Sequence, residues 1–135
     1  MSSIARGLWI SAVIAGTAAT GGCILAAAGA GAGGAVYVGD RGVESVVAGP
    51  VDRVYEASRQ AFKALGIAET KTSTEQDGGV EKRVLAGTIT DRKVTASLRS
   101  QGTGTHVEVV VETSAVTWDK KLAKRVMEKV VALAK

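Results

Sequence analysis

Two neighbouring runs of sequence decide the fold: KVTASLRS (residues 93–100) and THVEVVVET (residues 105–113). In the first run, Val94, Ala96 and Leu98 alternate with polar residues, and in the second run positions 107, 109 and 111 are valine. Such alternation predicts β-strands with one apolar face and one largely polar face. The short glycine-containing linker at residues 101–104 joins them as an antiparallel pair, which we expect to be covered on one side.

Further strands are predicted upstream of this pair. Residues 80–90 form the preceding strand of the meander. Before it, a polar stretch allows an edge strand at residues 68–74, and Asp77-Gly78-Gly79 predicts a turn. Residues 42–48 (GVESVVA) predict a short strand that Gly49-Pro50 ends. We therefore expect an antiparallel sheet of four or five strands.

Two amphipathic helices accompany these strands. Residues 51–65 carry an apolar stripe that includes Val54 and Phe62, and Gly66 is a natural stop signal. The second helix, over residues 119–134, begins at a cap provided by Thr117 or Asp119. Its apolar stripe consists of Leu122, Val126, Val130 and Leu133. Helices with one apolar stripe each are expected to pack on one face of the sheet.

The predicted fold class is therefore α+β: an N-terminal hydrophobic membrane segment, then a small antiparallel sheet with two helices packed on one face. The segment occupies residues 1–39 and the soluble domain residues 40–135. The whole chain has 135 residues, of which 46% are hydrophobic and only 4% aromatic, so the core of this single domain must be aliphatic.

The N-terminal segment contains no charged residue from position 7 to position 39. As one helix it would be about 50 Å long, which exceeds the roughly 30 Å of a bilayer core. Residues 8–19, preceded by Arg6, have the length of a signal-peptide hydrophobic region, and small residues then lead to Cys23. Two interpretations follow. Either Cys23 is lipidated and residues 1–22 are removed, or the segment is an uncleaved transmembrane helix.

Either interpretation predicts membrane attachment through residues 8–38. Gly29 and Gly33 form a GxxxG pattern, which lets helices pack closely in lipid, although the same run can serve as a flexible spacer. A GxGxxG match at Gly29, Gly31 and Gly34 lacks the surrounding βαβ unit, so no dinucleotide site is expected. The positive N-terminal side predicts a domain outside the cytoplasm, on the periplasmic side.

The chain also resembles a known family. The resemblance rests on the Gly/Ala-rich run after Cys23, on Tyr37-Val38, and on Pro50 followed by the pattern of the first predicted helix. In these features, and in its charged C-terminal helix, the sequence is similar to a family of short bacterial lipoproteins of unknown function. The resemblance implies a location in the cell envelope and this order of strands and helices, but it implies no activity.

The residues offer little catalytic chemistry. One cysteine and one histidine exclude a disulfide within the chain and a Cys/His zinc site. His106, Glu108 and Glu112 share one strand face, but a metal site would need a further ligand. We interpret them as a solvated face. The sequence therefore predicts no catalytic residue, no metal and no cofactor.

The sequence indicates contact residues more clearly than catalytic ones. Lys120, Lys121, Lys124 and Arg125 form a basic cluster on the last helix, suited to anionic headgroups or to an acidic partner, or simply to solvent. Trp118 beside them either closes the end of the core or is an exposed contact residue. Nucleic acid is not expected as a partner, because the chain has few aromatic residues for stacking.

These features together predict a non-enzymatic, membrane-anchored envelope protein with a periplasm-facing interaction or structural domain. It would act as a free lipoprotein or as an accessory subunit of a larger membrane complex, with protein partners that the sequence does not identify. The alternative is an envelope module that binds a small apolar ligand or lipid between helices and sheet.

Overall fold

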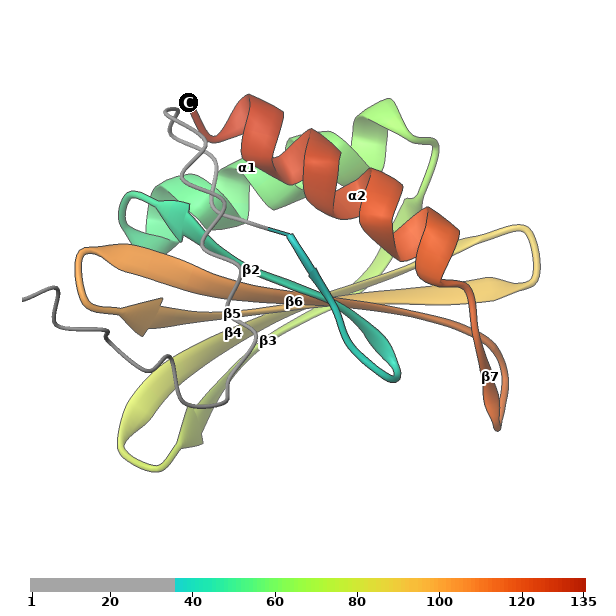
Figure 1. Cartoon of the computed structure of the whole chain (residues 1–135), viewed down its shortest axis with the longest axis horizontal. Coiled ribbons are helices and arrows are strands. Elements are labelled where there is room, and N and C mark those ends of the chain that lie inside the picture. Colours follow the sequence, from blue (N-terminus) through green and yellow to red (C-terminus); the bar gives the residue numbers. More distant parts are fainter. Residues whose placement is uncertain (1–35) are drawn as a thin grey trace, which may run out of the picture.

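The computed structural model describes residues 36–135, which form one sheet and two helices (Figure 1). The helices are α1 (Val51–Ala64) and α2 (Lys120–Leu133). The strands are β1 (Tyr37–Val38), β2 (Gly42–Ala48), β3 (Ala68–Asp77), β4 (Val80–Ile89), β5 (Arg92–Gln101), β6 (Gly104–Ser114) and β7 (Thr117–Trp118). The α+β class is confirmed.

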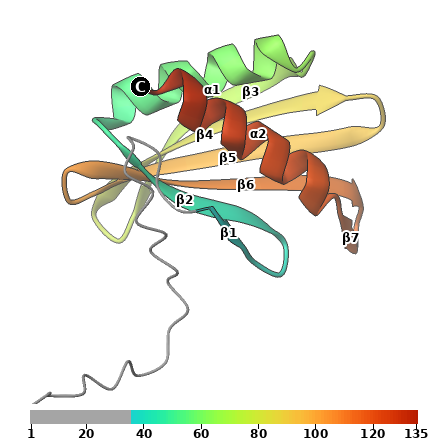
Figure 2. The same cartoon turned by 45° about the horizontal axis from the view of Figure 1, so that its top comes forward.

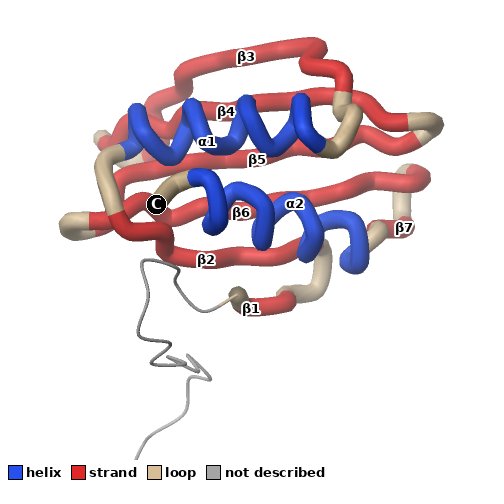
Figure 3. The backbone as a smooth tube through the Cα atoms, turned by 90° about the horizontal axis from the view of Figure 1, so that it is seen from above, coloured by secondary structure: helices blue, strands red, loops and turns tan. Residues whose placement is uncertain are grey.

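All strand pairs of the described chain are antiparallel, in the spatial order β1-β2-β6-β5-β4-β3, with β7 paired to β6. The meander from β3 to β6 follows the predicted order. The early strand β2 joins it beside β6, so residues 42–48 pair with residues 104–110. Figure 3 shows this order from above, with β3 at one edge and β1 at the other.

Both helices lie on the same face of the sheet (Figures 1 and 3). Helix α1 covers the β3–β5 side, whereas α2 lies over β2 and β6. The apolar side chains between helices and sheet form one core. Its largest fully buried members are Phe62, Leu85, Leu98, Met127, Val43, Val47, Val54, Val94, Val107, Val109, Val111 and Val126.

The strand register explains why this core is continuous. Val109 of β6 lies opposite Val43 of β2 on one side and opposite Ala96 of β5 on the other. Ala96 in turn lies opposite Leu85 of β4. All four side chains are fully buried. Since opposite residues share a face, this row and its neighbours form the apolar surface on which the helices pack.

Helix α1 is fixed at both ends by its sequence. Pro50 precedes it in an extended conformation (φ −70°, ψ 156°). Gly66 follows it with φ +73°, a conformation that favours glycine. Arg83 of β4 bonds Asp52 of α1 at 2.6 Å and Glu81 of its own strand at 3.0 Å. The hydrogen bond to Glu81 raises the pKa of Arg83 above its ordinary value.

Helix α2 begins at Asp119, one of the two predicted caps. Its carboxylate accepts a hydrogen bond from the backbone N–H of Leu122 at 2.9 Å and pairs with Arg92 at 2.9 Å. This contact satisfies a backbone donor at the helix start. The other predicted cap, Thr117, instead belongs to β7.

The edges of the sheet differ most from the sequence analysis. Strand β3 extends to Asp77, three residues beyond its predicted end, and the two-residue strands β1 and β7 were not predicted. Strand β1 takes Tyr37 and Val38, which the sequence analysis assigned to the membrane segment. Such short strands carry too little periodicity to be recognised.

Residues 1–35 of the predicted membrane segment lie outside the described residues. They include Cys23, Gly29 and Gly33, the predicted lipidation and helix-packing positions. Within residues 36–135, no helix combines the length and apolar character that crossing a bilayer requires.

Candidate functional site

The predicted basic cluster lies on the solvent side of α2. The helix turns a buried stripe toward the core, formed by Leu122, Ala123, Val126, Met127 and Val130. The opposite side carries Lys120, Lys121, Lys124, Arg125 and Lys129, all of them exposed. We call these five residues the basic surface. Spacings of three and four residues place them on one side of a helix.

The basic surface carries unbalanced positive charge. Its one acidic neighbour on the helix is Glu128, which pairs with Lys124 at 3.9 Å. Among the described residues, no ion pair engages Lys120, Lys121, Arg125 or Lys129. Elsewhere in residues 36–135, eleven Lys and Arg residues are balanced by twelve Asp and Glu residues. Some of these form ion pairs, such as that of Arg59 with Glu69 at 3.2 Å, which raises the pKa of Arg59. The surplus positive charge of the domain is therefore gathered on α2.

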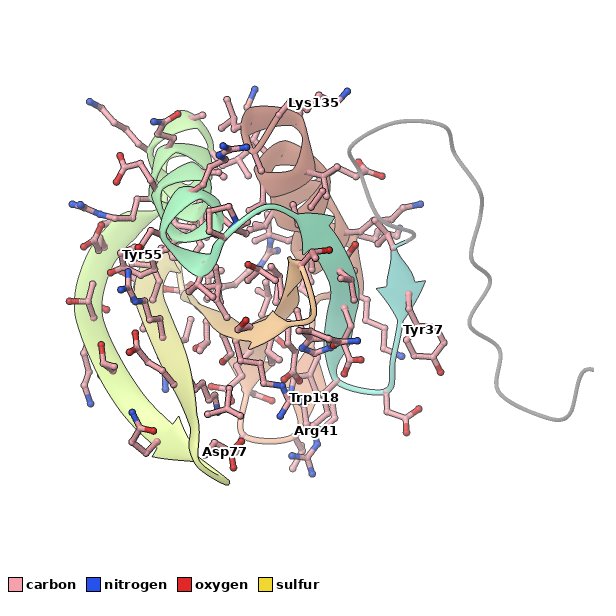
Figure 4. The ribbon with its side chains drawn as sticks, turned by 90° about the vertical axis from the view of Figure 1, so that its left-hand side faces the viewer. Tyr37, Arg41, Tyr55, Asp77, Trp118 and Lys135 are labelled. Carbon is pink, nitrogen blue, oxygen red and sulfur yellow. The ribbon has the colours of Figure 1, made fainter. Side chains whose placement is uncertain are left out.

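A corner of the domain adjoins the start of α2. Trp118 of β7 is half-buried, and the Arg41 guanidinium lies 5.8 Å from its ring centroid (Figure 4). Arg41 comes from the β1–β2 turn, and Val116, 74% exposed, comes from the β6–β7 turn. We call Arg41, Val116 and Trp118 the tryptophan corner. A cation over an indole ring and an exposed apolar residue are groups suited to a headgroup region.

Trp118 is not part of the buried core cluster of the described chain. Its partner Arg41 was missed by sequence reasoning, and so was the exposed Val116. The contact between Arg41 and Trp118 joins residues far apart in sequence, and no local sequence pattern predicts such a contact. The only signal in the sequence was the tryptophan itself.

The uncharged N-terminal run enters the domain on the α2 side. Strand β1 lies at the sheet edge beside β2, and α2 packs over β2 and β6 (Figures 2 and 3). Tyr37 and Val38, the residues of β1, are about half exposed. The basic surface and the entry of the hydrophobic run thus lie toward the same edge of the sheet.

The helix-free face of the sheet holds His106 and its neighbours. His106 Nε2 lies 3.6 Å from Glu44 Oε2, at a shallow depression of about 100 Å³ that Glu108, Lys82 and Arg99 also line. Glu112 is set apart and approaches Lys93 at 3.9 Å. Across residues 36–135, no group of three His, Cys, Asp or Glu side chains could hold a metal ion. The face is a mixture of both charges.

The side chains between the helices and the sheet are buried. Phe62, Leu98 and Met127 are each at most 1% exposed there. This is the layer in which the sequence analysis placed a small apolar ligand. Binding of such a ligand stays a prediction.

No family model matches the chain, and comparisons with curated proteins and with solved structures found no match. The resemblance to short bacterial lipoproteins therefore stays a prediction.

Proposed function

We propose that this chain is a membrane-anchored protein of the bacterial envelope. Its domain faces the periplasm and acts by contact rather than by catalysis, either as a free lipoprotein or as an accessory subunit. We further propose that the basic surface lies on the anionic headgroups of the membrane that holds the N-terminal segment. The observation that carries this proposal is the gathering of unpaired cations on α2, toward the edge where the uncharged run enters.

Charge and geometry support this contact together. Each Lys or Arg held near an anionic leaflet contributes about 1 kcal/mol, so five such residues can hold a tethered domain on the surface. The anchor also keeps the domain close to the bilayer, which raises the local concentration of headgroups around α2. The tryptophan corner takes no part in this contact, because Trp118 lies opposite Glu112 and so on the helix-free face of the sheet.

The mode of anchoring has its own test, the intact mass of the protein extracted from its native membrane. We expect loss of residues 1–22 together with the added mass of a diacylglycerol and an acyl chain on Cys23. An unmodified chain that retains its first residues would instead assign residues 8–35 to a transmembrane helix. Recovery in the aqueous fraction without detergent would contradict anchoring altogether.

The headgroup contact is tested by lysine acetylation of the full chain in nanodiscs. We expect Lys120, Lys121, Lys124 and Lys129 to react several-fold more slowly when the bilayer contains anionic phosphatidylglycerol than when it is purely zwitterionic. Lys63 on α1 serves as an internal reference. The protection should vanish in 1 M salt, because the Debye length falls to about 3 Å.

A matched pair of variants sharpens this experiment. Replacing Lys121, Lys124 and Arg125 with glutamine removes about 3 kcal/mol of attraction, so the docked fraction should fall on the order of 100-fold and Lys129 should lose its protection. Lys63→Gln on α1 should leave the protection unchanged. Equal acetylation in both nanodiscs would contradict the lipid contact. Protection seen only in native membranes would assign the surface to an acidic protein instead.

A further inference from the structure

Strand β3 is the long free edge of the sheet. It has ten residues, AETKTSTEQD, and nine of them are exposed. In the described part of the chain it pairs with β4 alone, so the backbone groups on its other side meet no strand. Such an edge is a template for pairing with another chain. The opposite edge, β1, has only two residues.

The side chains of β3 complement a second copy of themselves. If two copies pair antiparallel about Ser73, Lys71 of each lies opposite Glu75 of the other, and Thr72 lies opposite Thr74. The like-charged Asp77 and Glu69 also fall opposite each other, but Glu69 precedes the regular part of the strand. Opposite charges and threonine pairs directly across a strand pair are both stabilising. Shifting the axis to Thr74 places Lys71 opposite Asp77. Both registers therefore match the one lysine of the strand with a carboxylate of the other copy.

The irregularity at the start of β3 limits the pairing segment. A register shift between Glu69 and Lys71 interrupts the ladder with β4. Glu69 is also engaged by Arg59 of α1 at 3.2 Å. Residues 71–77 remain regular, and Ser73 and Glu75 already contact each other at 3.4 Å on one face of the strand. This regular segment is long enough for several cross-strand pairs.

We propose that two copies of this chain pair through β3, antiparallel and with two-fold symmetry, so that their sheets become one. A two-fold axis perpendicular to the sheet keeps both helix layers on the same side. Both basic surfaces then point the same way, and both β1 edges lie at the outer ends. Pairing also covers the long edge of each copy, so the assembly closes at two chains.

Cross-linking of the full chain in mild detergent tests this pairing without any lipid, so its result is independent of the headgroup proposal. The test uses Ser73→Cys in a Cys23→Ala background, so that each copy carries one thiol. In the proposed pair the Cβ atoms of the two residues at position 73 lie about 4.5–5.5 Å apart, within reach of a short cross-linker. We expect a short bis-maleimide to convert this variant to a covalent dimer at least ten-fold faster than Val38→Cys. Val38 provides the matched control because it lies on the other edge strand.

Reversing the charges of Lys71 and Glu75 then tests the register of the two β3 strands. Lys71→Glu should slow the cross-linking at Ser73→Cys about ten-fold, since both ion pairs become repulsive. The double variant Lys71→Glu with Glu75→Lys should restore the rate. A rate at Ser73→Cys no higher than at Val38→Cys would overturn the proposal. An unchanged rate in the Lys71→Glu variant would overturn the strand pairing as well.

Discussion

Replacing Val109 with lysine is expected to prevent the domain from folding, whereas the same replacement at the next residue, Val110, is expected to be tolerated. Val109 is fully buried in the middle of β6, between Val43 and Ala96. An ammonium group there would lose its hydration without gaining a partner. The effective penalty is several kcal/mol, comparable with the roughly 5–15 kcal/mol that stabilises a whole domain.

Val110 is the matched control because it lies on the helix-free face of the same strand. It is only partly buried, and Glu108 and Glu112 flank it on that face. A lysine at this position can reach solvent and two carboxylates. Far-UV circular dichroism with urea titration should show a cooperative transition for Val110→Lys and none for Val109→Lys. Similar behaviour of both variants would contradict the assignment of the two faces.

Replacing Phe62 with alanine is expected to lower the free energy of unfolding by about 3–5 kcal/mol, through lost burial and the cavity left behind. Phe62 is the only phenylalanine of the chain and is 1% exposed. It lies against Gly87 of β4, where an added Cβ would come within 3.2 Å of its ring. Gly87 has no side chain that could fill the space that the ring leaves.

The measurement for this second variant is the urea midpoint at constant m-value, compared with Lys63→Ala. Lys63 is the exposed neighbour of Phe62 on α1, so its truncation should change stability by less than about 0.5 kcal/mol. A loss below 1 kcal/mol for Phe62→Ala would argue against the packing of α1 on the sheet.

The sequence predicts the elements of this fold well, because their periodicities are strong. The bounds of β2 are those expected, α1 ends one residue earlier than predicted, and α2 is one residue shorter at each end. The placement of β2 beside β6 was not predicted. It depends on how Val43 and Val47 meet the valines of β6, a long-range match that no local pattern encodes.

For the candidate site, the sequence located the basic residues but not their setting. Periodicity was enough to place Lys121 and Lys124 opposite the apolar stripe of α2. The distribution of ion pairs over the surface, and the contact of Arg41 with Trp118, arise only in the folded chain. Whether β3 has a free outer side depends likewise on the strand order, which the sequence does not state.

The pairing of β2 with β6 also sets the order in which the domain can form. Strand β2 is made early, but its partner residues 104–110 follow about sixty positions later. Closing so long a loop costs conformational entropy, and this cost is offset only when the strand pair is complete. Pairing of this kind is therefore a slow and late step. The β3–β6 meander can assemble from neighbouring hairpins beforehand. A chain that emerges N-terminus first therefore keeps β2 without its partner strand until nearly all of the domain has followed.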